Sequence, residues 1–130
     1  NILHLPVRNE GGLFFCGDGH AIQGHGEIGG VACEVPVNLV CRFEVVKGQA
    51  IDWPRVTNDT HLMVIGSARP LEDATRIATA ELVKWVSSDY GLSLNDALVW
   101  ITQVLELRVG NVCDPNYSVV AAVPRAALTE

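Results

Sequence analysis

Residues 61–86 read HLMVIGSARPLEDATRIATAELVKWV, and within them the hydrophobic period changes from that of a strand to that of a helix. The first seven residues predict a strand, in which His61 is expected to be partly buried and hydrogen-bonded. Pro70 then opens a helix whose first turn carries Glu72 and Asp73, where the helix dipole favours negative charge. Apolar residues recur on one face of this predicted helix: Leu71, Ala74, Ala78, Leu82, Trp85 and Val86.

The residues that follow extend this pattern to the end of the chain. Gly91 is expected to end the first helix, and Ser93 to cap a second one with Asp96 three residues later. The second helix has its own apolar stripe: Leu94, Ala97, Leu98, Ile101 and Val104 or Leu105. Strands are predicted over 105–112 and 117–124. The order strand, helix, helix, strand, strand indicates an α+β fold, since a parallel sheet would alternate strands and helices.

The first half of the chain predicts short strands separated by Gly, Pro and Asn. They are expected at 2–7, 12–16, 28–35 and 37–46, with 49–56 as an edge strand because Pro54 has no N–H to donate. In the fourth, alternate residues are expected on one buried face: Val37, Leu39, Cys41, Phe43 and Val45. We therefore expect a sandwich-like, β-rich part over 1–58 and a β-α-α-β-β layer over 59–130, packed as one compact unit.

The composition indicates that this chain does not work alone. Of its 130 residues 48% are hydrophobic and 18% are charged, whereas about a quarter of the residues are charged in a typical soluble domain. Some apolar surface should therefore meet another chain or a further part of the same chain. A strand that begins at residue 1 also predicts a fragment or processed chain of a larger protein. We expect a homo-oligomer, a second chain that supplies an amino-terminal region, or both.

Charge and cysteine content exclude several classes of function. The net charge is −6 and no basic residues cluster, so nucleic-acid binding is not expected. No apolar run approaches the roughly 20 residues of a membrane span, and no signal peptide is visible. The four cysteines form no CxxC motif and are expected to be buried free thiols, which indicates a reducing, cytoplasmic compartment. One of them, Cys16, lies beside the polar segment described next and is an alternative nucleophile.

Residues 17–27, GDGHAIQGHGE, concentrate polar residues among glycines. A GxGxxG match at Gly24 is not a dinucleotide site, because strand-like residues follow it where a helix would be needed. A zinc-protease HExxH motif is excluded too. His20 and His25 are five residues apart, and the glycines between them disfavour a helix.

A metal site remains possible in this segment. Asp18 and His20 are two residues apart and share a face in an extended chain, which is the spacing for two ligands of one divalent ion. A carboxylate and an imidazole suit zinc, with calcium as the alternative. Glu27 is a further candidate ligand or a general base. The competing interpretation is an Asx-turn at Asp18 in a loop with solvated histidines.

The same segment resembles the GDGHAAQGDGE signature of the acetamidase/formamidase family. The similarity continues through LPVRNEGGLFFCGDGH upstream, VACEVPV with Glu34 downstream, and LELRVGNVCDPNYSVVAAVPRAAL near the end. It runs nearly end to end along this chain but covers only the carboxy-terminal part of the family's chains. One position departs from the signature, since His25 stands where the family has an aspartate.

The resemblance implies a hydrolase that converts a short-chain amide, such as formamide or acetamide, to its acid and ammonia. The positions carried over from the family are Asp18, His20, Gln23, Glu27 and Glu34. Their chemistry assigns Asp18 and His20 to a metal and Glu27 to activation of the attacking water. Gln23 is expected to hydrogen-bond the amide, while Glu34 orients a ligand histidine or is itself a ligand. Two alternatives stay open, namely a non-catalytic subunit of a two-chain amidase and an amidase that uses Cys16 without metal.

Overall fold

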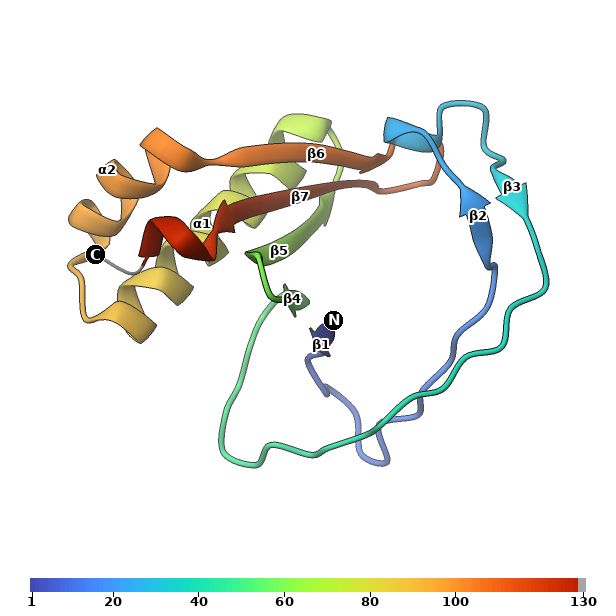
Figure 1. Ribbon diagram of the computed structural model, residues 1–130, viewed down its shortest axis with the longest axis horizontal. Coiled ribbons are helices and arrows are strands. Elements are labelled where there is room, and N and C mark those ends of the chain that lie inside the picture. Colours follow the sequence, from blue (N-terminus) through green and yellow to red (C-terminus); the bar gives the residue numbers. More distant parts are fainter. Residues whose placement is uncertain (129–130) are drawn as a thin grey trace.

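The computed structural model describes residues 1–128 and has a mixed α+β fold (Figure 1). Its main sheet has five antiparallel strands in the order β1-β4-β5-β7-β6. Their bounds are β1 (Ile2–His4), β4 (Arg55–Thr57), β5 (His61–Ala68), β7 (Tyr117–Pro124) and β6 (Glu106–Asn111). Helix α1 (Leu71–Tyr90) packs against β5 and β7, and α2 (Leu94–Val104) packs against α1. The predicted α+β class is confirmed.

The core lies between α1 and the two central strands. β5 and β7 pair along eight residues, from His61 opposite Pro124 to Ala68 opposite Tyr117. Alternate side chains of these strands are buried and meet the apolar stripe of the helix. The resulting cluster includes Leu62, Val64, Ala78, Leu82, Trp85, Val86, Ala97, Ile101, Ala121 and Val123. The apolar faces predicted from the period of two in the strands and of 3.6 in the helix therefore pack against each other.

A glycine allows α1 to approach β5 closely. Gly66 is buried, and a Cβ atom at this position would collide with the carbonyl oxygen of Ala74 and the backbone nitrogen of Ala78. The helix backbone therefore rests directly on the strand. Any larger residue at Gly66 would have to push the two elements apart.

The predicted helix boundaries are confirmed by their caps. Gly91 adopts a left-handed conformation with φ 65°, and its N–H donates to the carbonyl oxygen of Ser87, which ends α1. Ser93 begins α2 by accepting a hydrogen bond from the backbone N–H of Asp96 at 3.1 Å. These caps satisfy backbone groups that a helix end leaves unpaired.

Between β1 and β4 the chain makes a long excursion, which we call the arm (residues 5–50). It contains β2 (His20–Ile22), a 3-10 turn η1 (His25–Glu27) and β3 (Cys33–Glu34). Two limbs of the arm leave the main sheet as an open arc, and the hairpin of β2 and β3 lies at the far end (Figure 1). The arm returns to the main sheet at η1, where the carbonyl of Gly26 accepts a hydrogen bond from the N–H of Val112 at 2.8 Å.

Several expectations for the first half are wrong. The described residues form no strand over 12–16 or 37–46, and the strands expected at 2–7, 28–35 and 49–56 shrink to β1, β3 and β4. The predicted buried face of 37–46 is exposed. The limbs that contain 12–16 and 37–46 touch at Phe14 and Phe43, but the described residues of these segments form no regular ladder of backbone hydrogen bonds. The sandwich-like arrangement and the division of the chain at residue 58 stay predictions.

The cysteines also depart from expectation. All four are free thiols, as predicted, but all four are exposed, so the prediction of burial is wrong: Cys16, Cys33, Cys41 and Cys113. Three of them lie in or beside the arm, which has no core of its own. Within residues 1–128, no helix is long and apolar enough to cross a membrane.

Candidate metal site on the glycine-rich hairpin

The β2–β3 hairpin brings three ligand-type side chains together. Asp18, His20 and Glu34 each offer one ligand atom, and these atoms lie within 4.8 Å of one another. We call these residues the triad. His20 and Glu34 are directly paired across β2 and β3, and Asp18 lies two residues before His20. Strand pairing therefore brings His20 and Glu34 together, whereas Asp18 reaches them from a residue just outside β2.

The backbone at Asp18 is shaped to place its carboxylate. Asp18 has a positive φ of 56°, a left-handed conformation that Asp adopts more readily than most residues. The next residue, Gly19, accepts a hydrogen bond from the N–H of Val35 at 2.9 Å, which continues the hairpin pairing. As a result, Oδ1 of Asp18 lies 3.3 Å from Nε2 of His20, although the carboxylate itself is largely exposed.

Gln23 orients the imidazole ring of His20. The amide nitrogen of Gln23 donates to the carbonyl oxygen of Gly110 at 3.2 Å, so its Oε1 is left to face Nδ1 of His20 at 2.8 Å. Since an amide oxygen only accepts, Nδ1 of His20 must carry the proton. The lone pair of Nε2 then faces Asp18. A second residue that holds the other ring nitrogen in this way is typical of metal-binding histidines.

Glu27 lies on the opposite side of the ring from Asp18. Its Oε1 is 3.9 Å from Nδ1 of His20, and its side chain is only 15% exposed. The backbone of Glu27 also has a positive φ, 43°, which is rare for a glutamate and turns the chain sharply at η1. Glu27 therefore adjoins the triad without belonging to it. His25, in the same turn, is exposed and makes no hydrogen bond or ion pair within residues 1–128.

The surroundings of His20 favour positive charge. The hydrogen bond with Gln23 raises the pKa of His20 above its ordinary value. Desolvation opposes this shift, and the carboxylates of Asp18 and Glu27 add to it. An imidazole among these acceptors attracts a cation, whether a proton or a metal ion.

The triad opens onto solvent. A shallow depression beside it is lined by Asp18, Gly19, Glu34, Val35 and Pro36. A second depression, at the edge of the main sheet near Asn1 and Arg125, contains no comparable group of ligands. The triad therefore has the right donors, but these residues do not enclose a substrate.

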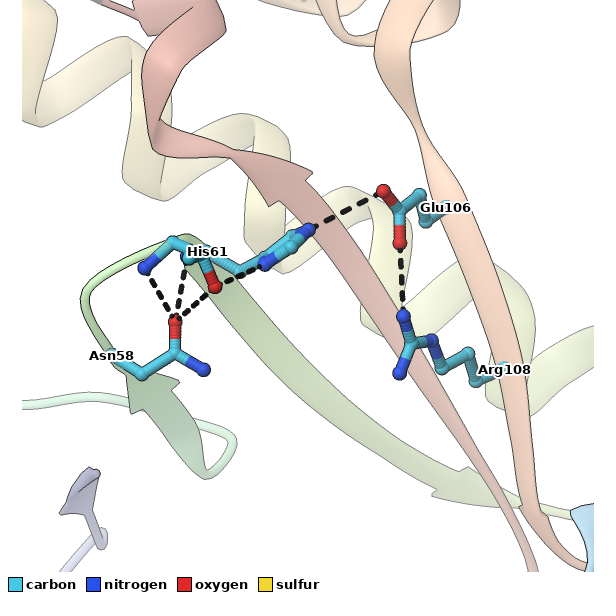
Figure 2. Close-up of polar contacts among 5 residues, drawn as sticks. Asn58, His61, Glu106 and Arg108 are labelled. Atoms are coloured by element: carbon cyan, nitrogen blue, oxygen red, sulfur yellow. Dashed lines mark hydrogen bonds and ion pairs between the residues drawn. The ribbon is translucent and has the colours of Figure 1, made fainter.

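A second polar cluster lies at the other end of the main sheet and has a structural role (Figure 2). Nε2 of His61 lies 3.3 Å from Oε1 of Glu106, whose Oε2 accepts a hydrogen bond from Arg108 at 3.2 Å. Asn58 accepts from the backbone N–H of His61 at 2.7 Å. This network ties β5 to β6 across the intervening β7, and it confirms the expectation of a partly buried, hydrogen-bonded His61.

Cys16 gains no activating neighbour from the fold. Its thiol is exposed and takes part in no hydrogen bond or ion pair in the part of the chain that the structure describes. A nucleophilic cysteine normally has a nearby base or cation that favours the thiolate. The geometry thus favours the triad over Cys16 as the chemical centre.

Comparison with known proteins agrees with the sequence resemblance. The model of the acetamidase/formamidase family matches residues 1–129. A solved acetamidase from Yersinia enterocolitica is 41% identical, with a TM-score of 0.88, and the match covers 98% of this chain and 39% of that one. An acetamidase from Bacillus halodurans is 25% identical with a TM-score of 0.63, covering 82% of this chain and 36% of that one.

A predicted acetamidase/formamidase from Thermoanaerobacter tengcongensis shares the fold, with 24% identity and a TM-score of 0.67 over 84% of this chain and 36% of that one. A search of curated proteins found no significant match. The matches cover 39%, 36% and 36% of the three solved structures, so the chain spans well under half of their length.

Proposed function

Because the chain belongs to the acetamidase/formamidase family, we propose that it carries the metal site of an amidohydrolase acting on short linear amides. The substrates would be formamide-like or acetamide-like, and the products a carboxylic acid and ammonia. The observation that carries this proposal is the convergence of Asp18, His20 and Glu34 at the tip of the hairpin.

The donors of the triad fit a divalent cation. With its proton on Nδ1, His20 presents a lone pair on Nε2 toward a carboxylate oxygen of Asp18 at 3.3 Å. Two acceptors at this distance repel each other unless a positive charge lies between them. Two carboxylates and an imidazole suit zinc. Calcium, the alternative, takes oxygen ligands and would use the carboxylates alone. A bound cation would polarise the amide carbonyl and lower the pKa of the attacking water.

Glu27 is the proposed general base. It adjoins the triad, and its largely buried side chain lies 3.9 Å from His20 at the closest polar atoms. Its carboxylate would accept a proton from water as the water oxygen bonds to the amide carbon. When the carbon–nitrogen bond breaks, the same proton would pass to the departing nitrogen, which leaves as ammonia.

The proposed role of Gln23 differs from the expected one, and for Glu34 we propose one of the two expected roles. Gln23 is engaged by His20 and Gly110, which supports a positioning role in place of the predicted contact with the substrate amide. Glu34 lies among the candidate ligand atoms, which supports direct ligation over a supporting role.

A second candidate function is a non-catalytic chain that completes a two-chain amidase. The observation that favours it is the open triad, which these residues do not enclose on their own. A small amide substrate, an oligomeric or two-chain assembly and a cytoplasmic location all stay proposals.

The decisive test of the proposed function uses Glu27→Gln in the complete enzyme. Ammonia release from a panel of short amides should fall by about 10²–10⁴-fold, the usual contribution of a general base. Metal content, measured by elemental analysis, should stay unchanged. Glu72→Gln is the matched control, because Glu72 is an exposed glutamate on α1. Full activity in the Glu27→Gln enzyme would refute the assignment.

A pair of inhibitors separates this mechanism from one based on Cys16. A chelator should abolish activity, and added zinc should restore it, if the triad holds the metal. An alkylating reagent should leave activity intact, although Cys16 is exposed enough to react. The opposite pattern would favour a thiol enzyme.

A further inference from the structure

Near its end, β6 has one residue more than its partner strand β7, which makes a β-bulge. Val109 pairs with Val119. The next pair is Asn111 with Ser118, so Gly110 lies opposite no residue of β7. A bulge interrupts the ladder and redirects the groups beside it, and bulges are common next to active sites. At Gly110, therefore, the main sheet can offer its backbone to another part of the chain.

The end of β6 binds the arm at two points. The carbonyl oxygen of Gly110 accepts a hydrogen bond from the side-chain amide of Gln23 at 3.2 Å. Two residues further on, the N–H of Val112 donates to the carbonyl oxygen of Gly26 at 2.8 Å. Figure 1 shows η1 beside this end of β6. The bulge and the residues after it therefore hold the segment that leads from Gln23 to Glu27.

A hydroxyl group holds the bulge in shape. Oγ of Ser118 accepts a hydrogen bond at 3.0 Å from the backbone N–H of Asn111, which follows the extra residue. The same oxygen fills the space beside Gly110, because a Cβ atom there would lie 2.4 Å from it. The side chain of Asn111 donates to Asp114 at 2.5 Å and so closes the turn that follows. Glycine at 110 and a hydroxyl at 118 are thus matched to each other.

The bulge is connected to the triad through Gln23. Since its amide nitrogen donates to Gly110, its Oε1 faces Nδ1 of His20 at 2.8 Å. An amide oxygen only accepts, so this contact keeps the proton of the neutral ring on Nδ1 and leaves Nε2 open to a cation. If the carbonyl of Gly110 turned away, the amide of Gln23 would be free to rotate, and either ring nitrogen could carry the proton.

The arm depends on this support because it has no core of its own. By contrast, β7 contributes Val119 and Ala121 to the buried core of the main sheet. A functional side chain is held most precisely when it is supported by a rigid element. The bulge therefore transmits the fixed geometry of the main sheet to a histidine that lies outside it.

We propose that Ser118 is a positioning residue for His20, acting through the bulge at Gly110 and the amide of Gln23. Within residues 1–128, its hydroxyl makes no hydrogen bond with a residue of the triad. The consequence for metal binding rests on the proposed function, whereas the effect on the tautomer of His20 does not. A serine with a purely structural role would change stability and leave the tautomer as it is.

The first test is the tautomer of His20 in the metal-free chain. It is measured by ¹⁵N NMR of histidine-labelled protein at about pH 9, where imidazoles are neutral. The signal of His20 is identified by its loss in His20→Gln. In Ser118→Ala, the population with the proton on Nε2 should rise about fivefold, the usual effect of losing one neutral hydrogen bond. An unchanged tautomer would overturn the proposal.

Two further serine variants separate the hydroxyl from its surroundings. Ser118→Thr keeps the hydroxyl and should keep the wild-type tautomer. Ser67→Ala is the matched control, because Ser67 lies directly opposite Ser118 on β5 and its hydroxyl makes no hydrogen bond in the described part of the chain. A shift in Ser118→Thr or in Ser67→Ala as large as that in Ser118→Ala would overturn the role of the hydroxyl.

Gly110→Ala disturbs the bulge by a different route and provides a test that does not remove the hydroxyl. Its new methyl group would collide with Oγ of Ser118, so the same rise in the Nε2 tautomer is expected. Circular dichroism should show that helix content is kept, since Gly110 and Ser118 lie outside the buried cluster. A wild-type tautomer in Gly110→Ala would overturn the path through the bulge.

Gln23→Leu removes the contact through which Ser118 is proposed to act. Adding Ser118→Ala to Gln23→Leu should therefore change the tautomer of His20 no further, because the two residues act in series. A further change of the same size as in the wild-type background would mean that Ser118 reaches His20 by another route, and it would overturn the proposal.

Zinc affinity of the complete enzyme, measured by calorimetry, distinguishes this proposal from the proposed function. Ser118→Ala should weaken zinc binding by about 3–10-fold, less than the loss of a residue that itself supports a ligand. An unchanged affinity despite a shifted tautomer would overturn the positioning role. A wild-type enzyme that binds no zinc would refute the proposed function, and the tautomer shift in Ser118→Ala would still support the positioning of His20.

Discussion

The sheet module (residues 51–128) and the arm contain similar apolar residues, but many of those in the module are buried and those in the arm are mostly exposed. In the module, β5 pairs with β7 along its whole length, and α1 covers the resulting surface, so that Val64 and Leu82 are fully buried. In the arm, Leu39 and Val40 face solvent. An apolar, alternating segment therefore builds a core only when a second backbone and a covering layer are present.

The largest contrast between the two regions should appear in leucine truncations. Leu82→Ala should destabilise the chain by about 2–5 kcal/mol, because it leaves a cavity in the core between α1 and the sheet. Leu39→Ala should cost less than about 0.5 kcal/mol, because Leu39 is 60% exposed. Urea unfolding of the chain alone measures both. Equal losses would mean that the arm already packs against something in the isolated chain.

A glycine pair provides a sharper version of the same contrast. Gly66→Ala should destabilise the chain by about 1–3 kcal/mol, because its new methyl group would collide with the backbone of α1. Gly24→Ala is the control, since a Cβ at Gly24 has no atom within 4 Å and its φ of −77° suits alanine. Thermal unfolding should separate the two variants. A stable Gly66→Ala protein would contradict the close approach of helix and strand.

A glutamine substitution probes the link between the regions. Gln23 joins the triad on the arm to Gly110 of β6, so Gln23→Leu should free the ring of His20. Zinc affinity of the complete assembly, measured by calorimetry, should fall by about 10–100-fold, as is usual when a supporting residue of a metal ligand is lost. Gln103→Leu, on the exposed face of α2, is the control. Unchanged affinity for both would make the link purely structural.

The smallest effect should come from the polar network of the module. The hydrogen bond with His61, followed by that with Arg108, lowers the pKa of Glu106 below its ordinary value of 4.5. A carboxylate whose folded-state pKa is lowered stabilises the fold above its unfolded-state pKa, and this contribution is lost as the pH falls through the folded-state value.

Glu106→Gln should therefore lower stability slightly near pH 7, and the deficit should shrink as the pH falls below 4.5. The effect is small because the Glu106 side chain is 40% exposed and water screens the interaction. Urea unfolding at several pH values measures it, with Glu72→Gln as control. A deficit that grows toward acid pH would contradict the sign of the shift.

The elements of the module could be predicted closely because their signals are local. The change of period after Ser67, the stop at Gly91 and the cap at Ser93 each depend on neighbouring residues, and the structure has all of them. Strand prediction failed in the arm for the complementary reason. Alternation over 37–46 reports which side chains could share a buried face, but the layer that would bury them is not part of these residues.

The candidate site likewise has features that the sequence could predict and features that it could not. The spacing of Asp18 and His20 indicated a shared face, and the structure places their closest polar atoms 3.3 Å apart. Family resemblance pointed to Glu34, but its approach to His20 depends on the register of β2 and β3. The contact of Gln23 with Gly110 spans 87 positions of the chain and has no local signal.

The sequence by itself determined the order of elements from residue 61 onward, the positions of the helix caps and the kinds of donor available for a metal. These follow from side-chain size, polarity and spacing over a few residues. The tertiary structure alone decided which donors meet, which tautomer His20 adopts and which apolar face stays open. Each of these depends on strand register and on contacts between distant segments, and short-range spacing carries no information about either.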